Sequence, residues 1–448
     1  NRIWCKVTIP ILWELPFGQE CRANDRKLWK KALCIRTYIS CMDTQARTLL
    51  IRKGFDLSSS PPQATFDYPS FTHKLIINNL VYFISIYSQR IIGSNRDNKN
   101  NSNNELKILF REICKIIKFV ESFKMTEVLN YITNSKNYLK YIDSLLKLPG
   151  SPKKLKRNDR LIKPLIYDNI LNMELYLDSI PKMELLTKFI NVQKRLENLS
   201  IISNHYLKFD SIFWAVISQK EKLKSLRLKS VNFYNFKGKL TPIGQFISEL
   251  YIEDCRGLHE SDCLFFASSF TQLSSFRFRY TFDGYPQSRE FIIKILETAN
   301  INLRNIRLDL YPAISFDIFS AILNYCTNVT KLSLCNLSPK QIIEIFNNNF
   351  KELRRFSFDF GDKLFDPNEI LCQMAENIPK SIEIIKIKMD YDPWMFSAES
   401  LRKFFEGWCC KGGNKKIIVK CTEQARLFTL SDEYFKVIEE YGVEFNLI

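Results

Sequence analysis

A recurring apolar pattern in the second half of the chain predicts a series of short strands. Each copy has three apolar residues: the second comes three positions after the first, and the third comes two positions after the second. Because strand side chains alternate between two faces, the closely spaced pair predicts one buried face of a strand. The pattern occurs at Leu223/Leu226/Leu228, Ile247/Leu250/Ile252, Leu273/Phe276/Phe278, Leu303/Ile306/Leu308, Val329/Leu332/Leu334, Leu353/Phe356/Phe358 and Ile382/Ile385/Ile387.

The spacing of these copies predicts a repeat architecture. Their middle positions are 24 to 30 residues apart, close to the period of about 20–29 residues of leucine-rich repeats. Helix signals lie between them, as in Pro339–Phe350, in a segment from Ser397 to Gly407 and in one that ends at Gly442. A strand and a helix at this period bury their apolar faces only when copies stack. The prediction is an α/β leucine-rich-repeat solenoid, a curved parallel sheet with helices outside. Weaker or shortened copies occur at Leu196/Leu199/Ile201, Ile417/Val419 and Val443/Phe445/Leu447.

The first hundred residues predict a small helical segment. Helices are expected from Asn24, from Asp43 to Gly54, and from about Thr72. Their inward faces would hold Leu28, Ala32, Ile35 and Ile39, then Ala46, Leu49 and Leu50, then Ile76, Leu80, Phe83 and Tyr87. The stretch Ser94–Asn104 has no apolar residue and predicts an exposed loop. The predicted organisation has three parts: residues 1–16, a helical linker with the Asn-rich loop at 17–105, and a solenoid at 106–448. The clearest repeats of the solenoid lie at 196–448.

Composition places the chain among folded proteins of a reducing compartment. Of its 448 residues, 46% are hydrophobic and 25% charged, as in ordinary globular domains. The 13 cysteines show no C-x-x-C spacing, which favours free thiols and a cytoplasmic or nuclear location. No secretory signal is visible, and the longest nearly apolar run, Leu80–Tyr87, is far shorter than the roughly 20 residues that span a bilayer. No membrane association is therefore expected.

The net charge of +17 is concentrated in the first half of the chain. Residues 1–240 hold 41 Lys and Arg against 20 Asp and Glu, whereas residues 241–448 hold 24 against 28. Such asymmetry permits an anionic partner, and the basic run Lys153–Lys163 is the best candidate for nucleic-acid binding. The run lacks the interleaved aromatic residues of a stacking platform. We favour a solvated, charged loop, with a nucleic-acid binder as a less favoured class that predicts a steep loss of affinity with salt.

Residues with catalytic potential form no recognisable constellation. The three histidines, His73, His205 and His259, lie more than 50 residues apart and have no cysteine pair at metal-ligand spacing. Phosphate-binding loops and nucleophile elbows are also missing. The sequence therefore predicts no enzyme, no metal and no cofactor.

The outward residues of the predicted strands form the candidate binding surface. In leucine-rich repeats, the residues that alternate with the buried pair project from the concave sheet face. Four neighbouring strands would place Arg227, Tyr251, Arg277 and Arg307 side by side, and Arg and Tyr are enriched at interaction hot spots. An equally weighted alternative is that any exposed strand face must be polar. The candidate contacts for a protein substrate are Arg227, Tyr251, Arg277, Arg279, Arg307, Asp309, Arg355 and Asp359.

The two ends of the chain resemble a known family. The opening NRIWCKVTIPILWELPF is similar to the second half of an F-box, in which an apolar–Trp stretch lies on a helix and a Leu-Trp pair closes a small helical bundle. Other similar segments are SSPPQATFDYPSF, YCTNVTKLSL, IPKSIEIIKI and the tail from SAESLRKFFEGW onward. The whole chain resembles the fungal family of F-box-like leucine-rich-repeat proteins. The corresponding F-box residues here are Ile3, Trp4, Val7, Ile11, Leu12 and Trp13.

This resemblance implies a substrate-recognition subunit of a Skp–cullin–F-box ubiquitin ligase. The F-box would bind a Skp-type adaptor, and through it the cullin core, while the repeats hold the protein to be ubiquitinated. The first half of the F-box would lie upstream of Asn1, and the implied adaptor binding depends on it. The alternative is a free-standing repeat scaffold that binds a protein without any ligase.

Overall fold

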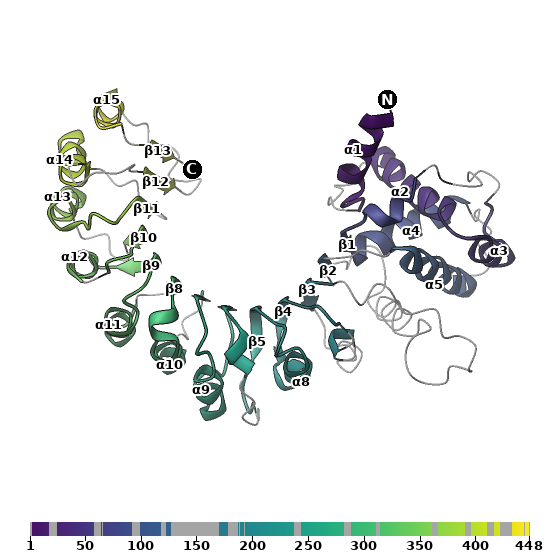
Figure 1. The fold of residues 1–448 in the computed structure, drawn as a ribbon, viewed down its shortest axis with the longest axis horizontal. Helices are drawn as coiled ribbons and strands as arrows, with labels where there is room; N and C mark the ends of the chain where they lie inside the picture. The colour runs from purple at the N-terminus through teal and green to yellow at the C-terminus, as the bar shows by residue number, and fades with distance from the viewer. Residues whose placement is uncertain are drawn as a thin grey trace. The chain divides into compact units, whose positions relative to one another are not determined.

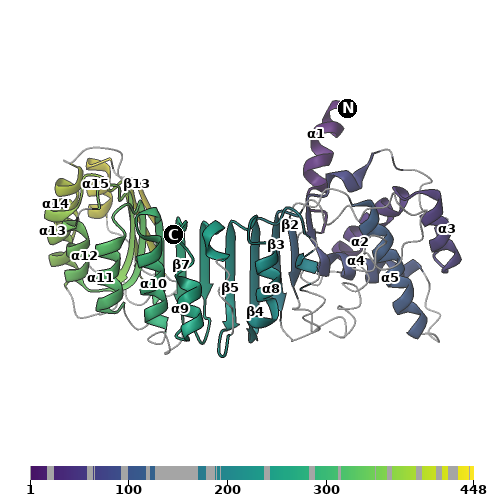
Figure 2. The same cartoon turned by 60° about the horizontal axis from the view of Figure 1, so that its bottom comes forward.

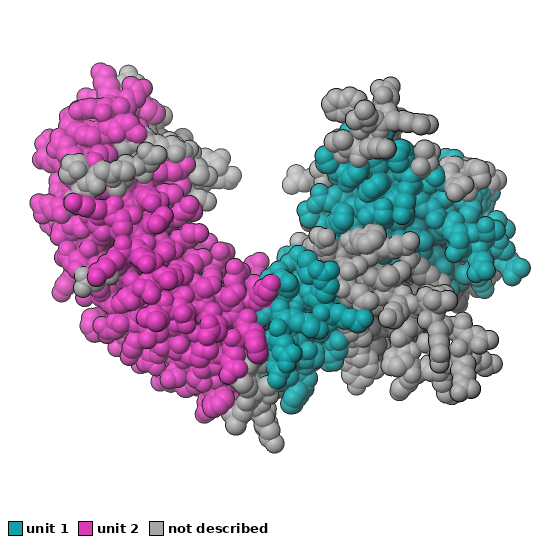
Figure 3. Space-filling model, in the orientation of Figure 1, with its two compact units in different colours: residues 1–223 teal, residues 224–448 magenta. Residues whose placement is uncertain are grey.

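The computed structural model separates into two compact units, residues 1–223 and 224–448 (Figure 3). The structure describes residues 2–17, 25–57, 64, 66–91, 99–117, 122–126, 170–177, 187, 189–191, 193–236, 243–281, 288–310, 314–348, 350–360, 366–389, 396–409, 416–421, 432–442 and 444–447. The basic run Lys153–Lys163 lies outside the described residues. We describe each unit by itself.

Unit 1 begins with helices around an aromatic core. Ala32, Ile35 and Ile39 are fully buried along one face of the second helix, as the apolar spacing predicted. Asp43 caps the third helix by accepting a hydrogen bond from the Ala46 N–H. The helices of this unit are α1 (Arg2–Trp13), α2 (Asp25–Ser40), α3 (Thr44–Arg52), the 3₁₀ helix η1 (Tyr68–Phe71), α4 (Ile77–Ile91), α5 (Lys99–Ile116) and α8 (Asp210–Ser218).

Two local predictions in this region are wrong. The helix expected from Thr72 starts only at Ile77, because Lys74–Ile76 form strand β1. This strand pairs in parallel with β2, which lies far along the chain, so local periodicity could not reveal it. The predicted loop Ser94–Asn104 is helical from Lys99 onward. The helix continues into the amphipathic segment up to Ile116, and it can include the Asn-rich stretch because Asn disfavours a helix only weakly.

The remainder of unit 1 already contains strands of the parallel sheet. Neighbouring strands pair in sequence order, β1 with β2, β2 with β3, and β3 with β4. Their bounds are β1 (Lys74–Ile76), β2 (Ser122–Thr126), β3 (Asn172–Leu177) and β4 (Asn198–Lys208). The weak apolar copy Leu196/Leu199/Ile201 therefore does mark a strand, β4.

Unit 2 is an α/β leucine-rich-repeat solenoid, as predicted. Its strands pair in parallel and in sequence order, and its helices lie on the outer side of the sheet (Figures 1 and 2). The strands are β5 (Ser225–Asn232), β6 (Glu249–Glu253), β7 (Ser275–Tyr280), β8 (Asn305–Leu310), β9 (Lys331–Leu337), β10 (Arg355–Phe360), β11 (Ile384–Met389), β12 (Lys416–Cys421) and β13 (Glu444–Leu447). The helices are η2 (Ile243–Phe246), α9 (Ser261–Ala267), α10 (Arg289–Ala299), η4 (Asn300–Asn302), α11 (Phe316–Tyr325), α12 (Pro339–Asn347), α13 (Pro367–Asn377), α14 (Ala398–Cys409) and α15 (Asp432–Glu440).

Each apolar triplet has one role in every repeat. The first residue, such as Leu273 or Leu303, is fully buried just before the strand begins, and the other two point from the strand into the same core. Where the strand begins, the backbone forms hydrogen bonds with the previous repeat. For example, the N–H groups of Ser274 and Ser275 both donate to the Ser248 carbonyl. Identical spacing thus produces identical register from strand to strand.

The helices between strands begin at the predicted signals, but one ends later than predicted. Helix α12 begins with a capping box in which Ser338 and Gln341 bond reciprocally. Helix α14 continues through Gly407 to Cys409, although Gly407 was predicted to end it. A Cβ at this position would lie 2.5 Å from the Ala375 carbonyl oxygen on α13. Gly407 therefore permits close helix packing and is not a stop signal.

Candidate functional site

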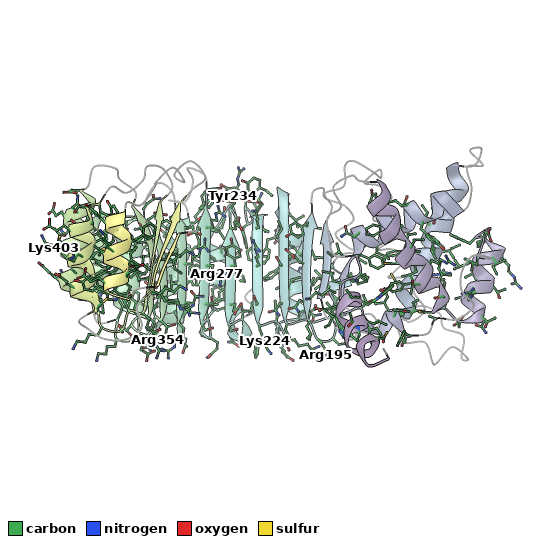
Figure 4. All side chains as sticks on the ribbon, turned by 90° about the horizontal axis from the view of Figure 1, so that it is seen from above. Arg195, Lys224, Tyr234, Arg277, Arg354 and Lys403 are labelled. Atoms are coloured by element: carbon green, nitrogen blue, oxygen red, sulfur yellow. The ribbon has the colours of Figure 1, made fainter. Side chains whose placement is uncertain are left out.

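The strand register places the predicted surface residues in rows across unit 2. The middle row contains Arg227, Tyr251, Arg277 and Arg307 on β5 to β8, in direct register. The last row, two residues further along each strand, contains Lys229, Glu253, Arg279 and Asp309. Side chains two residues apart share one face of a strand. We call these eight residues the strand-face patch, and Figure 4 shows Arg277 midway along its strand.

Glu253 organises one end of the strand-face patch. Its side chain is only 4% exposed, and its carboxylate accepts hydrogen bonds from Arg227 at 3.2 Å, Lys229 at 2.8 Å and the Tyr251 hydroxyl at 2.6 Å. The Arg279 guanidinium lies 3.7 Å from the same carboxylate. Three neighbouring strands are therefore tied together by one buried anion.

The partners of Glu253 keep it ionised. Burial alone would raise the pKa of its carboxyl, but hydrogen bonds from Lys229 and Tyr251, the Lys229 charge and the Arg227 hydrogen bond outweigh burial and lower that pKa. Burial and the hydrogen bond to Glu253 raise the pKa of Tyr251, so its hydroxyl remains a donor. The Arg227 guanidinium also lies 4.5 Å from the centre of the Tyr251 ring. These side chains are preorganised before any partner arrives.

Arg307 and Asp309 form a second, smaller group on β8. Two guanidinium nitrogens of Arg307 lie 2.6 and 2.8 Å from one Asp309 carboxylate oxygen. The Cys335 thiol donates to the other oxygen at 3.1 Å. Burial would lower the pKa of Arg307, but its hydrogen bond and charge pairing with Asp309 raise it.

Arg277 lies between these two groups and has no ion pair or hydrogen bond within the described part of the chain. Its side chain is exposed, as is that of Arg279 on the same strand. The structure therefore brings six predicted candidates together, Arg227, Tyr251, Arg277, Arg279, Arg307 and Asp309. Sequence reasoning placed Lys229 and Glu253 on this face but did not select them. The signal for Glu253 was an acidic residue in register with basic residues on both neighbouring strands.

The other two candidates lie elsewhere on the sheet. Arg355 is exposed at the start of β10, beside Lys331 on β9. Asp359 is only 7% exposed and accepts a hydrogen bond from the backbone N–H of Asn336, so it does not project freely from the sheet as expected. Asn336 adopts a positive φ of 56°, and its side-chain amide donates to the Leu310 carbonyl. Asp359 thus supports a strand end, a role that strand alternation alone could not reveal.

The residues that resemble an F-box lie on α1. The side chains of Ile3, Trp4 and Val7 are outside the described residues. Ile11 and Leu12 are 68% and 66% exposed. Trp13 packs against Tyr38 and Tyr68, with ring centres 5.5 and 4.6 Å apart. In the Leu12-Trp13 pair, Trp13 therefore packs into the helical bundle, whereas Leu12 is exposed.

The described residues contain neither a group of metal ligands nor a membrane-spanning helix. No group of three or more His, Cys, Asp or Glu side chains is placed to hold a metal ion there. No described helix is long and apolar enough to cross a membrane.

Comparisons with known proteins identify no family. The chain matches no protein-family profile and no curated protein in sequence. Among solved structures, it is similar to the yeast Rad7 and Elc1 complex, with a TM-score of 0.40, 15% sequence identity, and coverage of 71% of this chain and 75% of that chain.

Proposed function

We propose that the chain is the substrate-recognition subunit of a Skp–cullin–F-box-type ubiquitin ligase and holds its target protein on the strand-face patch. In this role the chain performs no chemistry. Instead, it raises the effective concentration of the target near the catalytic subunits of the ligase. The proposed setting is the cytoplasm or nucleus.

The observation that supports recognition most strongly is the exposed Arg277, which has no ion pair among the described residues and lies at the centre of a preorganised patch. Arg227, Tyr251 and Glu253 are already held in place by mutual contacts. Binding to side chains that are fixed in advance costs less conformational entropy. Arg and Tyr at the centre of such a surface are the residue types that most often dominate binding energy.

Two features support the ligase assignment. The opening of the chain resembles an F-box, and helix α1 presents Ile11 and Leu12 to solvent while Trp13 packs inward. An exposed apolar pair on a helix fits contact with another protein. In the proposed role, α1 contacts a Skp-type adaptor, which links the chain to the cullin core.

The proposal is tested by quantitative affinity purification of the full chain. The double variant Arg277→Glu/Arg307→Glu should lose identified target proteins by about ten-fold, because truncated or reversed hot-spot charges cost at least about 1.4 kcal/mol. Lys403→Glu is a control for charge reversal outside the patch, because Lys403 lies on the exposed face of α14 among the outer helices. Equal recovery of every target with the double variant would contradict recognition by this face.

The same purification separates the ligase subunit from a free-standing scaffold. A ligase subunit brings down a Skp-type adaptor, and Ile11→Glu/Leu12→Glu should reduce that adaptor while targets remain. Targets without any adaptor would favour the scaffold.

A further inference from the structure

We propose that Arg277 and Arg279 on β7 bind carboxylate side chains of an extended, acidic segment of the partner protein. This inference rests on the proposed use of the strand-face patch for recognition and names the chemistry of the target. It follows from which charges on the patch are already satisfied and which are not.

The two carboxylates of the patch are already engaged by other residues. Glu253 accepts hydrogen bonds from Arg227, Lys229 and Tyr251. Asp309 is held by Arg307 and by the Cys335 thiol. Arg279 lies 3.7 Å from Glu253 without a hydrogen bond, and it is 47% exposed. Arg277, which faces neither carboxylate at ion-pair distance, keeps its charge available for a partner.

The patch is also more basic than the unit that contains it. Residues 224–448 hold 29 Lys and Arg against 28 Asp and Glu, so unit 2 is nearly neutral. The patch instead has five cationic side chains and two carboxylates. Arg277 and Arg307 are direct neighbours across parallel strands, and Asp309 neutralises Arg307. A carboxylate of an acidic partner would neutralise Arg277 in the same way.

The spacing of the two exposed guanidinium groups on β7 favours carboxylates over a phosphate. Arg277 and Arg279 are two residues apart on one strand, which separates their Cα atoms by about 6.6 Å. An extended peptide presents its alternate side chains at the same interval, so Glu or Asp at every second position would match both arginines. Each planar guanidinium can take one carboxylate in a bidentate pair. A phosphate site would instead need several donors that converge on one point.

The test measures fluorescence anisotropy of labelled peptides with the full chain at about 50 and 150 mM salt. The probes are a peptide of alternating Glu and Ser, the same peptide with Gln for Glu, a phosphoserine peptide of equal net charge, and a single-stranded DNA oligonucleotide. We expect the Glu peptide to bind about ten-fold or more tightly than the Gln peptide. Binding should weaken as salt rises.

Three variants localise the binding. Arg277→Glu should reduce affinity for the Glu peptide by about ten-fold or more, whereas Lys403→Glu, with the same change in charge, should retain it. Arg277→Lys should give an intermediate affinity because it keeps the charge but loses the planar fork. Circular dichroism and unfolding curves of each variant establish that a loss of binding is not a loss of fold.

Several results would overturn the inference. Equal binding of the Glu and Gln peptides, or equal losses in Arg277→Glu and Lys403→Glu, would remove Arg277 as a carboxylate site. Preferential binding of the phosphoserine peptide would assign the patch to phosphoryl groups, and preferential binding of DNA would assign it to nucleic acid. If no acidic peptide binds but identified targets are still lost with Arg277→Glu/Arg307→Glu, the proposed function stands and only the acidic class of target is wrong.

Discussion

At the scale of single residues, Glu253 shows where strand alternation stops being informative. Alternation correctly predicted that Glu253 points out of the sheet on the face opposite the buried Ile252. It could not predict that the carboxylate would be covered by Arg227, Lys229 and Tyr251, because those contacts join residues two to 26 positions apart. Which outward side chains remain free, such as Arg277, depends on such contacts.

Replacing Glu253 should destabilise the fold. In Glu253→Gln, the partly exposed cations of Arg227 and Lys229 lose the buried carboxylate that neutralises them, and we expect a loss of about 2 kcal/mol in the free energy of unfolding. Urea titration of both proteins measures it. Glu249→Gln is the matched control, since Glu249 is exposed on the same strand and should change stability by less than about 0.5 kcal/mol. Equal effects of the two substitutions would contradict a structural role for Glu253.

The contribution of Glu253 should also depend on pH. Its pKa is lowered in the folded chain, whereas the pKa of Glu in an unfolded chain is about 4.3. A lowered pKa stabilises the fold fully above the unfolded pKa, and this stabilisation is lost as pH falls through the folded pKa. The difference in unfolding free energy between the original chain and Glu253→Gln should therefore shrink between about pH 5 and pH 3. A difference that stays constant over this range would show that the lost charge is not its cause.

At the scale of elements, equal spacing made the strands of unit 2 predictable, whereas the long intervals in unit 1 concealed β2 and β3. The spacing seen in unit 2 also occurs at Val120/Phe123/Met125 and Ile170/Met173/Leu175, at β2 and β3. Their middle residues are 50 positions apart, about two repeat lengths, so a search for even spacing passes over them. For the same reason, Lys74–Ile76 could be recognised as a strand only from its pairing with β2.

Helix ends were less predictable than helices, and Gly407 provides a test. An Ala in place of Gly within an exposed helix normally stabilises it by up to about 1 kcal/mol. In Gly407→Ala, the new Cβ would lie 2.5 Å from the Ala375 carbonyl oxygen. We therefore expect a loss of about 1–3 kcal/mol in the free energy of unfolding, because α13 and α14 must move apart.

Urea titration measures this change as well. Lys403→Ala, on the exposed face of α14, is the control and should stay within about 0.5 kcal/mol of the original chain. A Gly407→Ala chain as stable as the original would mean that Gly407 is not needed for helix packing.

At the scale of the whole molecule, the two units have separate parts in the proposed role. Unit 1 contains α1, with its exposed Ile11 and Leu12, and unit 2 contains the strand-face patch. Substitutions in one should therefore leave the binding of the other intact. The repeat fold could be predicted from the sequence, as could the strand register that brings six of the eight face candidates together. The ion pairs that fix the patch depend on contacts between strands, which no local pattern records.

The most direct test of the account is whether the chain bridges an adaptor and a target. A tagged Skp-type adaptor is purified from cells that produce the full chain, its Arg277→Glu/Arg307→Glu variant or its Lys403→Glu variant, and identified proteins are quantified. The account predicts that targets appear with the adaptor only when the chain is present, and that the double variant keeps the adaptor but loses the targets. Targets recovered equally with the double variant, or no association of the chain with the adaptor, would contradict it.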